Sequence, residues 1–488
     1  WQGETGRHQG AMEAQALYLM GVEPEWNARG VPDRLKLIPE SELGRPRVNV
    51  VFTVSGLYRD GLADKIVLLD RAARLAASAG DNALSRQNRE THAALVTAGV
   101  AKEEAAELAG ARVFTTAPGA YGFGLERFVE QSRDKDEPET MAQLYLTKMN
   151  HVYTEKTWGR NVPKLLQNQL RGNEAILHSR SSNLYGAVDN DDVYQWMGGL
   201  RVASEAAGAK PELLMNNMRR AGREKLEDAR GFIATELNAR NWNPRWIAEM
   251  QKEGYSGARE MMKSVEYLYG WQATTSETIS PTAWKKMYDV YVADEYNLGM
   301  QEFFDKANKA AKQVIVGRLL EVDRQGTYRF TASERVAMLK EFTRLVSSVG
   351  PACSANVCGN RKLREWVLER VREAAPAEIS RADANRLREQ FRGTADARPL
   401  PPQTQQVAAV DPAKLDPYRN FSAFKVRWVK IANFTSTARR VVADNPWLFA
   451  AVGAAILALG GLVALTKRRP AVWSELGIAA TTVEPSQS

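Results

Sequence analysis

The polar stretch with the clearest capacity for chemistry in this 488-residue sequence is a histidine followed by three aspartates. His178 closes a short apolar run that predicts a strand, and polar residues crowd after it as far as Asp189, Asp191 and Asp192. Open α/β sheets bind ligands beyond the carboxyl ends of their strands. Neutral imidazole suits borderline metals such as cobalt, and carboxylates can accept protons. We therefore predict a site here, with a hydrogen-bonded core histidine as the alternative.

A second candidate is the charged pair Arg59 and Asp60. It follows the apolar, β-branched run VNVVFTV at 48–54, which predicts a buried strand. Ser55-Gly56 breaks that run, and apolar residues at helical spacing then predict a helix as far as Asp70. A strand, a turn and a helix in this order begin an α/β unit, so the pair can line a cleft. The alternative is a solvated helix start.

A glycine-rich loop follows the predicted strand at 111–115. It reads PGAYGFG and contains Pro118, Gly119, Tyr121 and Gly122. Its glycines would let the backbone approach a flat ligand closely, and Tyr121 could stack on that ligand. The loop lacks the lysine of a Walker A motif, so we expect no ATP site within this chain. An ordinary tight turn is the alternative.

The elements that position these residues predict a chain in several parts. Strands and helices alternate up to residue 218, which predicts an α/β lobe with a mainly parallel sheet. Predicted helices fill an all-α lobe at 219–396, without strands. A proline-rich linker is predicted at 397–420 and a juxtamembrane segment at 421–446.

One transmembrane helix is predicted at residues 447–465. This stretch is apolar and carries no charge, and Trp447 and the basic residues 467–469 suit the two interfaces of a bilayer. A short tail, 466–488, would follow it. The basic residues after the span favour a cytoplasmic tail, which would place the bulk of the chain outside the cytoplasm. The sequence thus predicts a single-pass membrane protein with a C-terminal anchor.

Charge and cysteine content limit the partners and the cysteine chemistry that we expect. The net charge is +8, and no dense basic run with interleaved aromatic residues occurs, so a nucleic-acid partner is not expected. The only cysteines are Cys353 and Cys358. They can form a small disulfide loop in an oxidising compartment, or remain as two free thiols. The spacing is not that of a zinc-finger pair.

Several motifs, in order, resemble the large subunits of cobaltochelatase and magnesium chelatase. They are ALYLMGVEPEWNARGVPDRLKLIPESELGRPR, RPRVNVVFTVSGLYRDGLADKIVLLDRA, RVFTTAPGAYGFGL, NPRWIAEMQKEGYSGAREM, YLYGWQATT and VCGNRKLREWV. The resemblance runs from about residue 8 to about residue 375. It implies binding of a tetrapyrrole, exchange of its divalent metal (cobalt, magnesium or iron), and ATP use by partner ATPase subunits. Family members are much longer, so we interpret this chain as a C-terminal part.

The resemblance also implies further site residues. It adds Asn88 and His92 from the motif QNRETH, and His8 from the lead-in GETGRHQG. We predict that His178 and His92 converge with the three aspartates on one cleft beside the loop 118–124. Metal contacts are expected from His178, His92 and His8. Tetrapyrrole contacts are expected from Arg59, Asp60, Asn88, Pro118, Gly119, Tyr121, Gly122, Arg180 and Tyr185.

Two stretches depart from the usual family pattern. The stretch HSRSSNLYG with the acidic run DNDD resembles instead a membrane-anchored, chelatase-like branch found with haem and cobalamin uptake systems. There are therefore two alternatives to metal insertion. The chain could remove the metal from a tetrapyrrole, or it could be a non-catalytic tetrapyrrole carrier at the membrane. A related subgroup carries a Cys/His-rich cluster before CGN, whereas here this stretch contains no histidine.

Overall fold

The computed structural model describes residues 2–28, 32–130, 137–220, 222–353, 356–374, 378–392, 394 and 411–415. The expected membrane anchor at 447–465, the segment before it and the tail lie outside these ranges. Among the helices of the described residues, none combines the length and the apolar character that crossing a bilayer requires.

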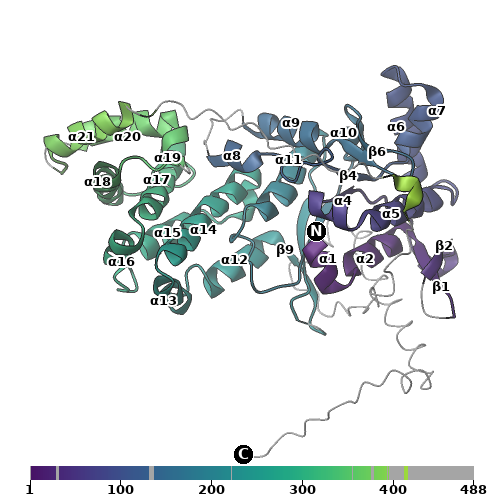
Figure 1. Ribbon diagram of the computed structural model, residues 1–488, viewed down its shortest axis with the longest axis horizontal. Helices are drawn as coiled ribbons and strands as arrows, with labels where there is room; N and C mark the ends of the chain where they lie inside the picture. The colour runs from purple at the N-terminus through teal and green to yellow at the C-terminus, as the bar shows by residue number, and fades with distance from the viewer. Residues whose placement is uncertain are drawn as a thin grey trace, which may run out of the picture.

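The described chain is a mixed α/β structure made mostly of helices with small sheets (Figure 1). The strands and the N-terminal helices lie together, and the later helices form a lobe at the opposite end of the molecule. The helices of the first part are α1 (Gln2–His8), α2 (Ala11–Met20), α3 (Glu40–Leu43), α4 (Gly56–Gly61), α5 (Ala63–Ala77), α6 (Ala83–Thr97), α7 (Lys102–Ala109), α8 (Leu125–Glu130), α9 (Glu137–Met149), α10 (Leu165–Gln169) and α11 (Gly199–Ala206).

Three small sheets replace the single parallel sheet that we predicted. The first sheet pairs β1 (Val22–Trp26) with β2 (Pro32–Leu37). The second sheet has the strand order β3 (Phe52–Thr53), β4 (Val113–Thr115), β5 (His151–Tyr153) and β6 (Trp158–Asn161). The third sheet has the order β7 (Ala175–Arg180), β8 (Glu212–Asn217) and β9 (Lys225–Asp228). In the part of the chain that is described, only β3–β4 and β7–β8 are parallel pairs.

The prediction of a mainly parallel sheet was wrong because short connections fold strands back on their neighbours. β5 and β6 are joined by residues 154–157, too few for the crossover that a parallel pair needs. β9 likewise returns antiparallel to β8, so strands do not end at residue 218 as we predicted. Asp228 then caps α12 by accepting a hydrogen bond from the Gly231 N–H, so that helix begins later than expected.

The predicted strand–turn–helix unit around Gly56 is present. The backbone of Phe52 and Val54 hydrogen bonds to β4. The Ser55 hydroxyl oxygen then accepts a 3.1 Å hydrogen bond from the Tyr58 N–H and caps α4. Apolar side chains of α5 pack beneath this unit, with Ile66 fully buried.

The later helices pack around large aromatic side chains. Trp271 and Trp284 are both fully buried, which agrees with the core role expected for aromatic residues in this lobe. Its helices are α12 (Ala229–Ala239), α13 (Pro244–Lys252), α14 (Tyr255–Thr274), α15 (Thr282–Tyr291), α16 (Met300–Ala307), α17 (Lys309–Gln325), α18 (Ala332–Val349), α19 (Asn356–Gly359), α20 (Arg361–Ala374) and α21 (Arg381–Arg392).

Candidate functional site

Helix α4 and the glycine-rich loop meet at a polar corner, which we call the α4 corner and define as Arg59, Asp60 and residues 116–121. The Arg59 side chain is 1% exposed. Its Nη1 donates to the carbonyl oxygens of Ala117 at 2.8 Å and Ala120 at 3.1 Å. Its Nε and Nη2 donate to the two oxygens of Asp60 at 2.6 and 2.8 Å. One buried cation in the last turn of α4 therefore ties this helix to the loop.

Two further contacts fix the loop. The buried hydroxyl of Tyr153 on β5 donates a 2.7 Å hydrogen bond to the carbonyl oxygen of Thr116. Gly56 lies so close to the loop that a Cβ atom there would stand 2.7 Å from the Ala120 carbonyl oxygen. Gly119 has φ of 78°, a left-handed conformation that favours glycine. The loop is thus held on two sides and turns at a glycine.

Tyr121 is the ligand-accessible group of the corner. It is 41% exposed, and its ring lies 5.5 Å from the Arg59 guanidinium carbon. The neighbouring Leu57 is 59% exposed. Burial works to raise the pKa of Asp60, but hydrogen bonds from Arg59 and from the Tyr121 hydroxyl hold that pKa below its ordinary value. The corner therefore offers solvent an aromatic ring beside an ionised carboxylate.

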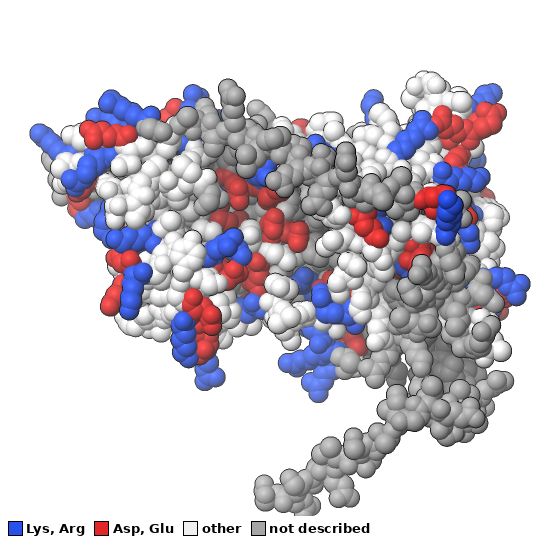
Figure 2. Space-filling model, in the orientation of Figure 1, with Lys and Arg blue, Asp and Glu red and all other residues white. Residues whose placement is uncertain are grey.

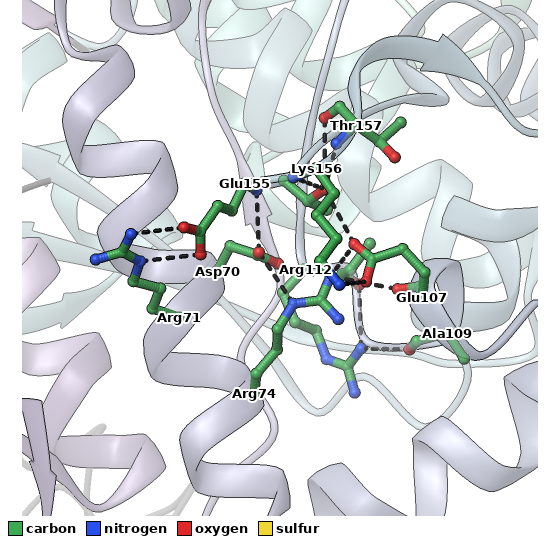
Figure 3. Close-up of polar contacts among 11 residues, drawn as sticks. Asp70, Arg71, Arg74, Glu107, Ala109, Arg112, Glu155, Lys156 and Thr157 are labelled. Atoms are coloured by element: carbon green, nitrogen blue, oxygen red, sulfur yellow. Dashed lines mark hydrogen bonds and ion pairs between the residues drawn. The ribbon is translucent and has the colours of Figure 1, made fainter. Parts of the chain in front are cut away.

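An ion-pair network supports the hairpin that carries Tyr153 (Figure 3). Asp70, fully buried on α5, accepts hydrogen bonds from Arg74 Nε at 3.0 Å and from the Glu155 N–H at 3.1 Å. Arg74 also donates to Glu107 on α7 at 2.6 Å, and Arg71 pairs with the Glu155 carboxylate. The turn between β5 and β6 is thereby fastened to two helices.

On its other side, α4 faces a histidine cluster, which we define as Glu4, His8, Glu13 and His178. Glu13 Oε1 accepts hydrogen bonds from the Tyr58 hydroxyl at 2.9 Å and the Thr5 hydroxyl at 2.8 Å. Among the described residues, no hydrogen-bond donor reaches Glu13 Oε2. His8 Nδ1 accepts a 3.1 Å hydrogen bond from the Ala11 N–H, so neutral His8 carries its proton on Nε2.

His178 approaches this cluster from β7. Burial, together with the positive charge of Arg180, lowers its pKa to about 3. Burial also lowers the pKa of His8. Although burial works to raise it, hydrogen bonds with Ser181 and Arg7 hold the pKa of Glu4 below its ordinary value. Two neutral imidazoles and two carboxylates thus share one buried region beneath α1.

The three predicted aspartates divide between two places. Asp189 accepts a hydrogen bond from the Gly186 N–H at 2.7 Å and forms an ion pair with Arg240. Asp191 accepts a 2.6 Å hydrogen bond from Gln195. Burial, with the neighbouring carboxylates of Asp191 and Glu126, raises the pKa of Asp192 to about 6.

An acidic cluster, defined as Glu126, Glu130, Asp191 and Asp192, forms where α8 approaches the start of the π-helical turn Tyr194–Gly198. Burial and then the carboxylate of Glu266 raise the pKa of Glu130 to about 7. Figure 2 shows acidic side chains gathered near the middle of the molecule on this face. Within the described ranges, no group of three or more His, Cys, Asp or Glu side chains is arranged to hold a metal ion.

His92 and Asn88 do not join these groups. Both lie on α6, which pairs with α7 in an arm at the edge of the molecule (Figure 1). The His92 Nε2 lies 3.3 Å from the carbonyl oxygen of Lys102 on α7. Asn88 Oδ1 accepts a 2.6 Å hydrogen bond from the buried Arg112. His92 thus has a partner on α7, and Asn88 has one just before β4. Among the contacts of the described residues, neither is joined to His178 or to the aspartates, as the predicted shared cleft would require.

Arg59 and Arg180 were predicted as tetrapyrrole contacts, but both guanidinium groups are turned inward. Arg180 is buried and donates to the carbonyl oxygen of Tyr185, whose own side chain is 55% exposed. Pro118 packs closely against Gly159 on β6, and a Cβ atom at Gly122 would meet nothing within 4 Å. The exposed aromatic side chains at these sites are Tyr121 and Tyr185.

The sequence reasoning missed Glu4, Glu13, Tyr58 and Tyr153. Glu13 had a detectable signal, since it is the only charged residue in the mostly apolar run AMEAQALYLM of α2. A carboxylate inside an apolar run must find partners when it is buried. Tyr153 had no such signal, because its role depends on a contact with Thr116.

The two cysteines are joined in the structure. A disulfide links Cys353 to Cys358, with 4.7 Å between the Cα atoms. Asn356 begins α19, and its Nδ2 donates a 2.8 Å hydrogen bond to Glu266 on α14. Glu266 in turn pairs with the buried Arg318.

Comparisons with known proteins match most of this chain. A family model described as CobN/Magnesium Chelatase matches residues 1–335. An aerobic cobaltochelatase subunit CobN from a Sinorhizobium species is 32% identical over 319 residues, covering 64% of this chain and 24% of that protein. The H subunit of a magnesium chelatase from Chlorobaculum parvum is 30% identical over 331 residues, covering 67% of this chain and 25% of that protein.

A solved structure is also similar. The catalytic subunit of cobaltochelatase from Mycobacterium tuberculosis superposes with a TM-score of 0.62 at 26% identity, covering 68% of this chain and 28% of that one. This chain therefore spans about a quarter of the length of the curated relatives it matches.

Proposed function

The chain belongs to the CobN/magnesium chelatase family, and from that premise we propose that it is the C-terminal part of a membrane-anchored chelatase large subunit. In this proposal it binds a tetrapyrrole and exchanges the central divalent metal, with ATP used by partner ATPase subunits. The metal, cobalt or magnesium in the named relatives, is a substrate here.

The observation that carries the proposal is the α4 corner. Its exposed Tyr121 ring stands on a loop held by Arg59 and Tyr153, beside the exposed Leu57. A flat macrocycle gains most from an aromatic face that is already fixed before binding, because little side-chain freedom is then lost. We assign the macrocycle plane to Tyr121.

We assign the metal contacts to the two imidazoles of the histidine cluster, although the described side chains there are not arranged as a preformed metal site. Metal binds to neutral imidazole, and burial keeps both His8 and His178 neutral at physiological pH. Glu13 adds a carboxylate oxygen that no described residue occupies. Tyr58 and Arg59 are adjacent on α4 but serve the cluster and the corner respectively, so one helix lies between the two regions.

Macrocycle protons need an acceptor. Asp191 and Asp192 remain candidates, since burial raises the pKa of both carboxyl groups and makes them better bases than exposed aspartates. The two aspartates belong to the acidic cluster, whereas Asp189 is engaged by Arg240.

The test is a porphyrin titration followed by metal exchange. The full chain in detergent is titrated with a metal-free porphyrin, and binding is followed by the shift of the Soret band. Exchange is then measured with Co²⁺ or Mg²⁺, with and without ATPase chelatase subunits. H178Q is expected to keep porphyrin affinity and to lose exchange, because it removes an imidazole from the cluster but leaves the corner intact.

His92 provides the matched control. H92Q is expected to change exchange by no more than about twofold, because His92 lies on the α6–α7 arm. Porphyrin binding by the wild-type chain without any exchange would favour a carrier. Release of metal from a loaded porphyrin would favour demetallation.

Anchoring is a separate part of the proposal. Residues 447–465 are long enough and apolar enough to span a bilayer, and basic residues follow them. Deletion of residues 440–488 is expected to release the protein into the soluble fraction. Recovery of the full chain in the soluble fraction after mild lysis would contradict the anchor.

A further inference from the structure

Arg59 has the charge expected of a residue that binds the carboxylates of a ligand, but all three nitrogens of its guanidinium group already donate hydrogen bonds within the protein. A guanidinium group has five N–H donors. Two of the Arg59 nitrogens face the carboxylate of Asp60, and the third donates to carbonyl oxygens of the loop. With the side chain 1% exposed, a ligand could reach this guanidinium only by displacing the loop.

We propose that Arg59 is a positioning residue that acts on tetrapyrrole binding through Tyr121, and that it does not contact the macrocycle. This inference rests on the proposed function, because it assigns a role in binding that ligand. It replaces the prediction from sequence that Arg59 itself contacts the tetrapyrrole.

The contacts form a connected path from the cation to the exposed ring. Arg59 fixes the carbonyl oxygens of Ala117 and Ala120, which precede Tyr121 in the loop. The Arg59 guanidinium carbon also lies over the Tyr121 ring, 5.5 Å from its centroid. The cation therefore holds the Tyr121 backbone through the loop and lies against its ring.

The same loop is held from β5, which gives an independent way to loosen it. The Tyr153 hydroxyl donates to the Thr116 carbonyl oxygen at 2.7 Å, and Arg59 Nη1 reaches the same oxygen at 3.3 Å. Tyr153 is fully buried, so it cannot contact a ligand that lies on Tyr121. Loss of the Tyr153 hydroxyl is expected to loosen the loop and weaken tetrapyrrole binding, as loss of the Arg59 guanidinium does. The effect should be smaller, because only one hydrogen bond to the loop is lost.

The test is a double-mutant cycle on porphyrin affinity, measured by Soret titration of the full chain in detergent. Y121A is expected to raise Kd about tenfold through loss of the stacking surface. R59K keeps the charge beside Asp60 but cannot reach the loop carbonyls, and is expected to raise Kd roughly fivefold. Y153F is expected to raise it about threefold.

The decisive measurement is the effect of R59K in the Y121A background. If Arg59 acts through Tyr121, R59K has almost no further effect once the ring is absent. A full additional loss in R59K/Y121A would mean that Arg59 contacts the macrocycle, and would overturn the proposal. If R59K does not fold, the effect of Y153F is compared in the wild-type and Y121A backgrounds instead. Almost no effect of Y153F on Kd in the Y121A background would show that the loop acts through Tyr121, and a full additional loss would overturn this.

Hydrogen exchange separates this inference from the proposed function, since it needs no ligand. In the ligand-free chain, R59K is expected to speed exchange of the backbone amides at 117–122 selectively, leaving β7 and β8 unchanged. Unchanged exchange at 117–122 would overturn the positioning role. Absence of any porphyrin binding by the wild-type chain would instead overturn the proposed function, whatever the exchange result.

Discussion

The Tyr58 hydroxyl donates a 2.9 Å hydrogen bond to Glu13 Oε1, which joins α4 to α2 through the interior of the protein. The next residue on α4, Arg59, points the other way and holds the loop beneath Tyr121. Displacement of α4 would therefore disturb the histidine cluster and the α4 corner together.

The first prediction concerns this hydrogen bond. E13A removes the acceptor of both Tyr58 and Thr5, and is expected to lower the free energy of unfolding by about 1–3 kcal/mol because two buried hydroxyl groups lose their partner. Y58F should cost about 1 kcal/mol. Urea unfolding measures both. Y255F, at an exposed tyrosine, is the control and should be neutral.

The second prediction concerns pH and the acidic cluster. The pKa of Glu130 is raised to about 7 in the folded chain, above the ordinary value of 4.5, so between these values the folded state binds more protons than the unfolded state. The contribution of Glu130 to the free energy of unfolding is therefore fully present below pH 4.5. It is lost as pH rises from 4.5 through 7, at up to roughly 1.4 kcal/mol per pH unit.

E130Q removes this titration, so it should stabilise the chain at pH 8 relative to wild type and have little effect at pH 4.5. Unfolding by urea at several pH values tests this. E90Q, on the exposed side of α6, should not change the pH dependence. A wild-type stability that rises steadily from pH 5 to pH 8 in parallel with E130Q would contradict the assignment.

The third prediction compares two members of the network in Figure 3. D70A removes a fully buried carboxylate, and is expected to cost about 1–3 kcal/mol because Arg74 Nε and the Glu155 N–H both lose their acceptor. R71A breaks the partly exposed pair with Glu155 and should cost no more than about 1 kcal/mol. Thermal unfolding distinguishes them; equal effects would mean that burial is not decisive here.

The fourth prediction concerns Cys353 and Cys358. In native membranes both should resist alkylation until a reductant is added, because they are joined in a disulfide. C353S/C358S should lower the free energy of unfolding by about 2 kcal/mol through the lost loop constraint. Alkylation is counted by mass spectrometry. Two thiols that react in untreated membranes would show a reduced pair, and would argue for a cytoplasmic location of this lobe.

Local signals predicted local structure well. The break at Ser55-Gly56 marks the capped start of α4, as predicted. Strand β9 was missed because its sequence, KLED, shows no apolar run; its pairing with β8 supplies the stabilisation.

The site was harder to predict than the elements. The sequence identified Arg59, Asp60 and Tyr121 as a group, and the structure brings them together. It could not show that the Arg59 guanidinium faces inward, since that depends on carbonyl groups more than fifty residues away. His92 was assigned from a motif, and a motif does not show that α6 leaves the rest of the molecule as part of an arm.

The long separation in sequence between the two halves of the α4 corner has a consequence for synthesis. Arg59 leaves the ribosome well before its acceptors at residues 116–120, and Tyr153 follows later still. At about 5–20 residues per second, the nascent chain spends several seconds with this guanidinium unable to reach its final partners. β7, which brings His178 to His8, emerges after that. The N-terminal helices must therefore be protected from aggregation or degradation during translation, and a pause before residue 153 would prolong their need for a chaperone.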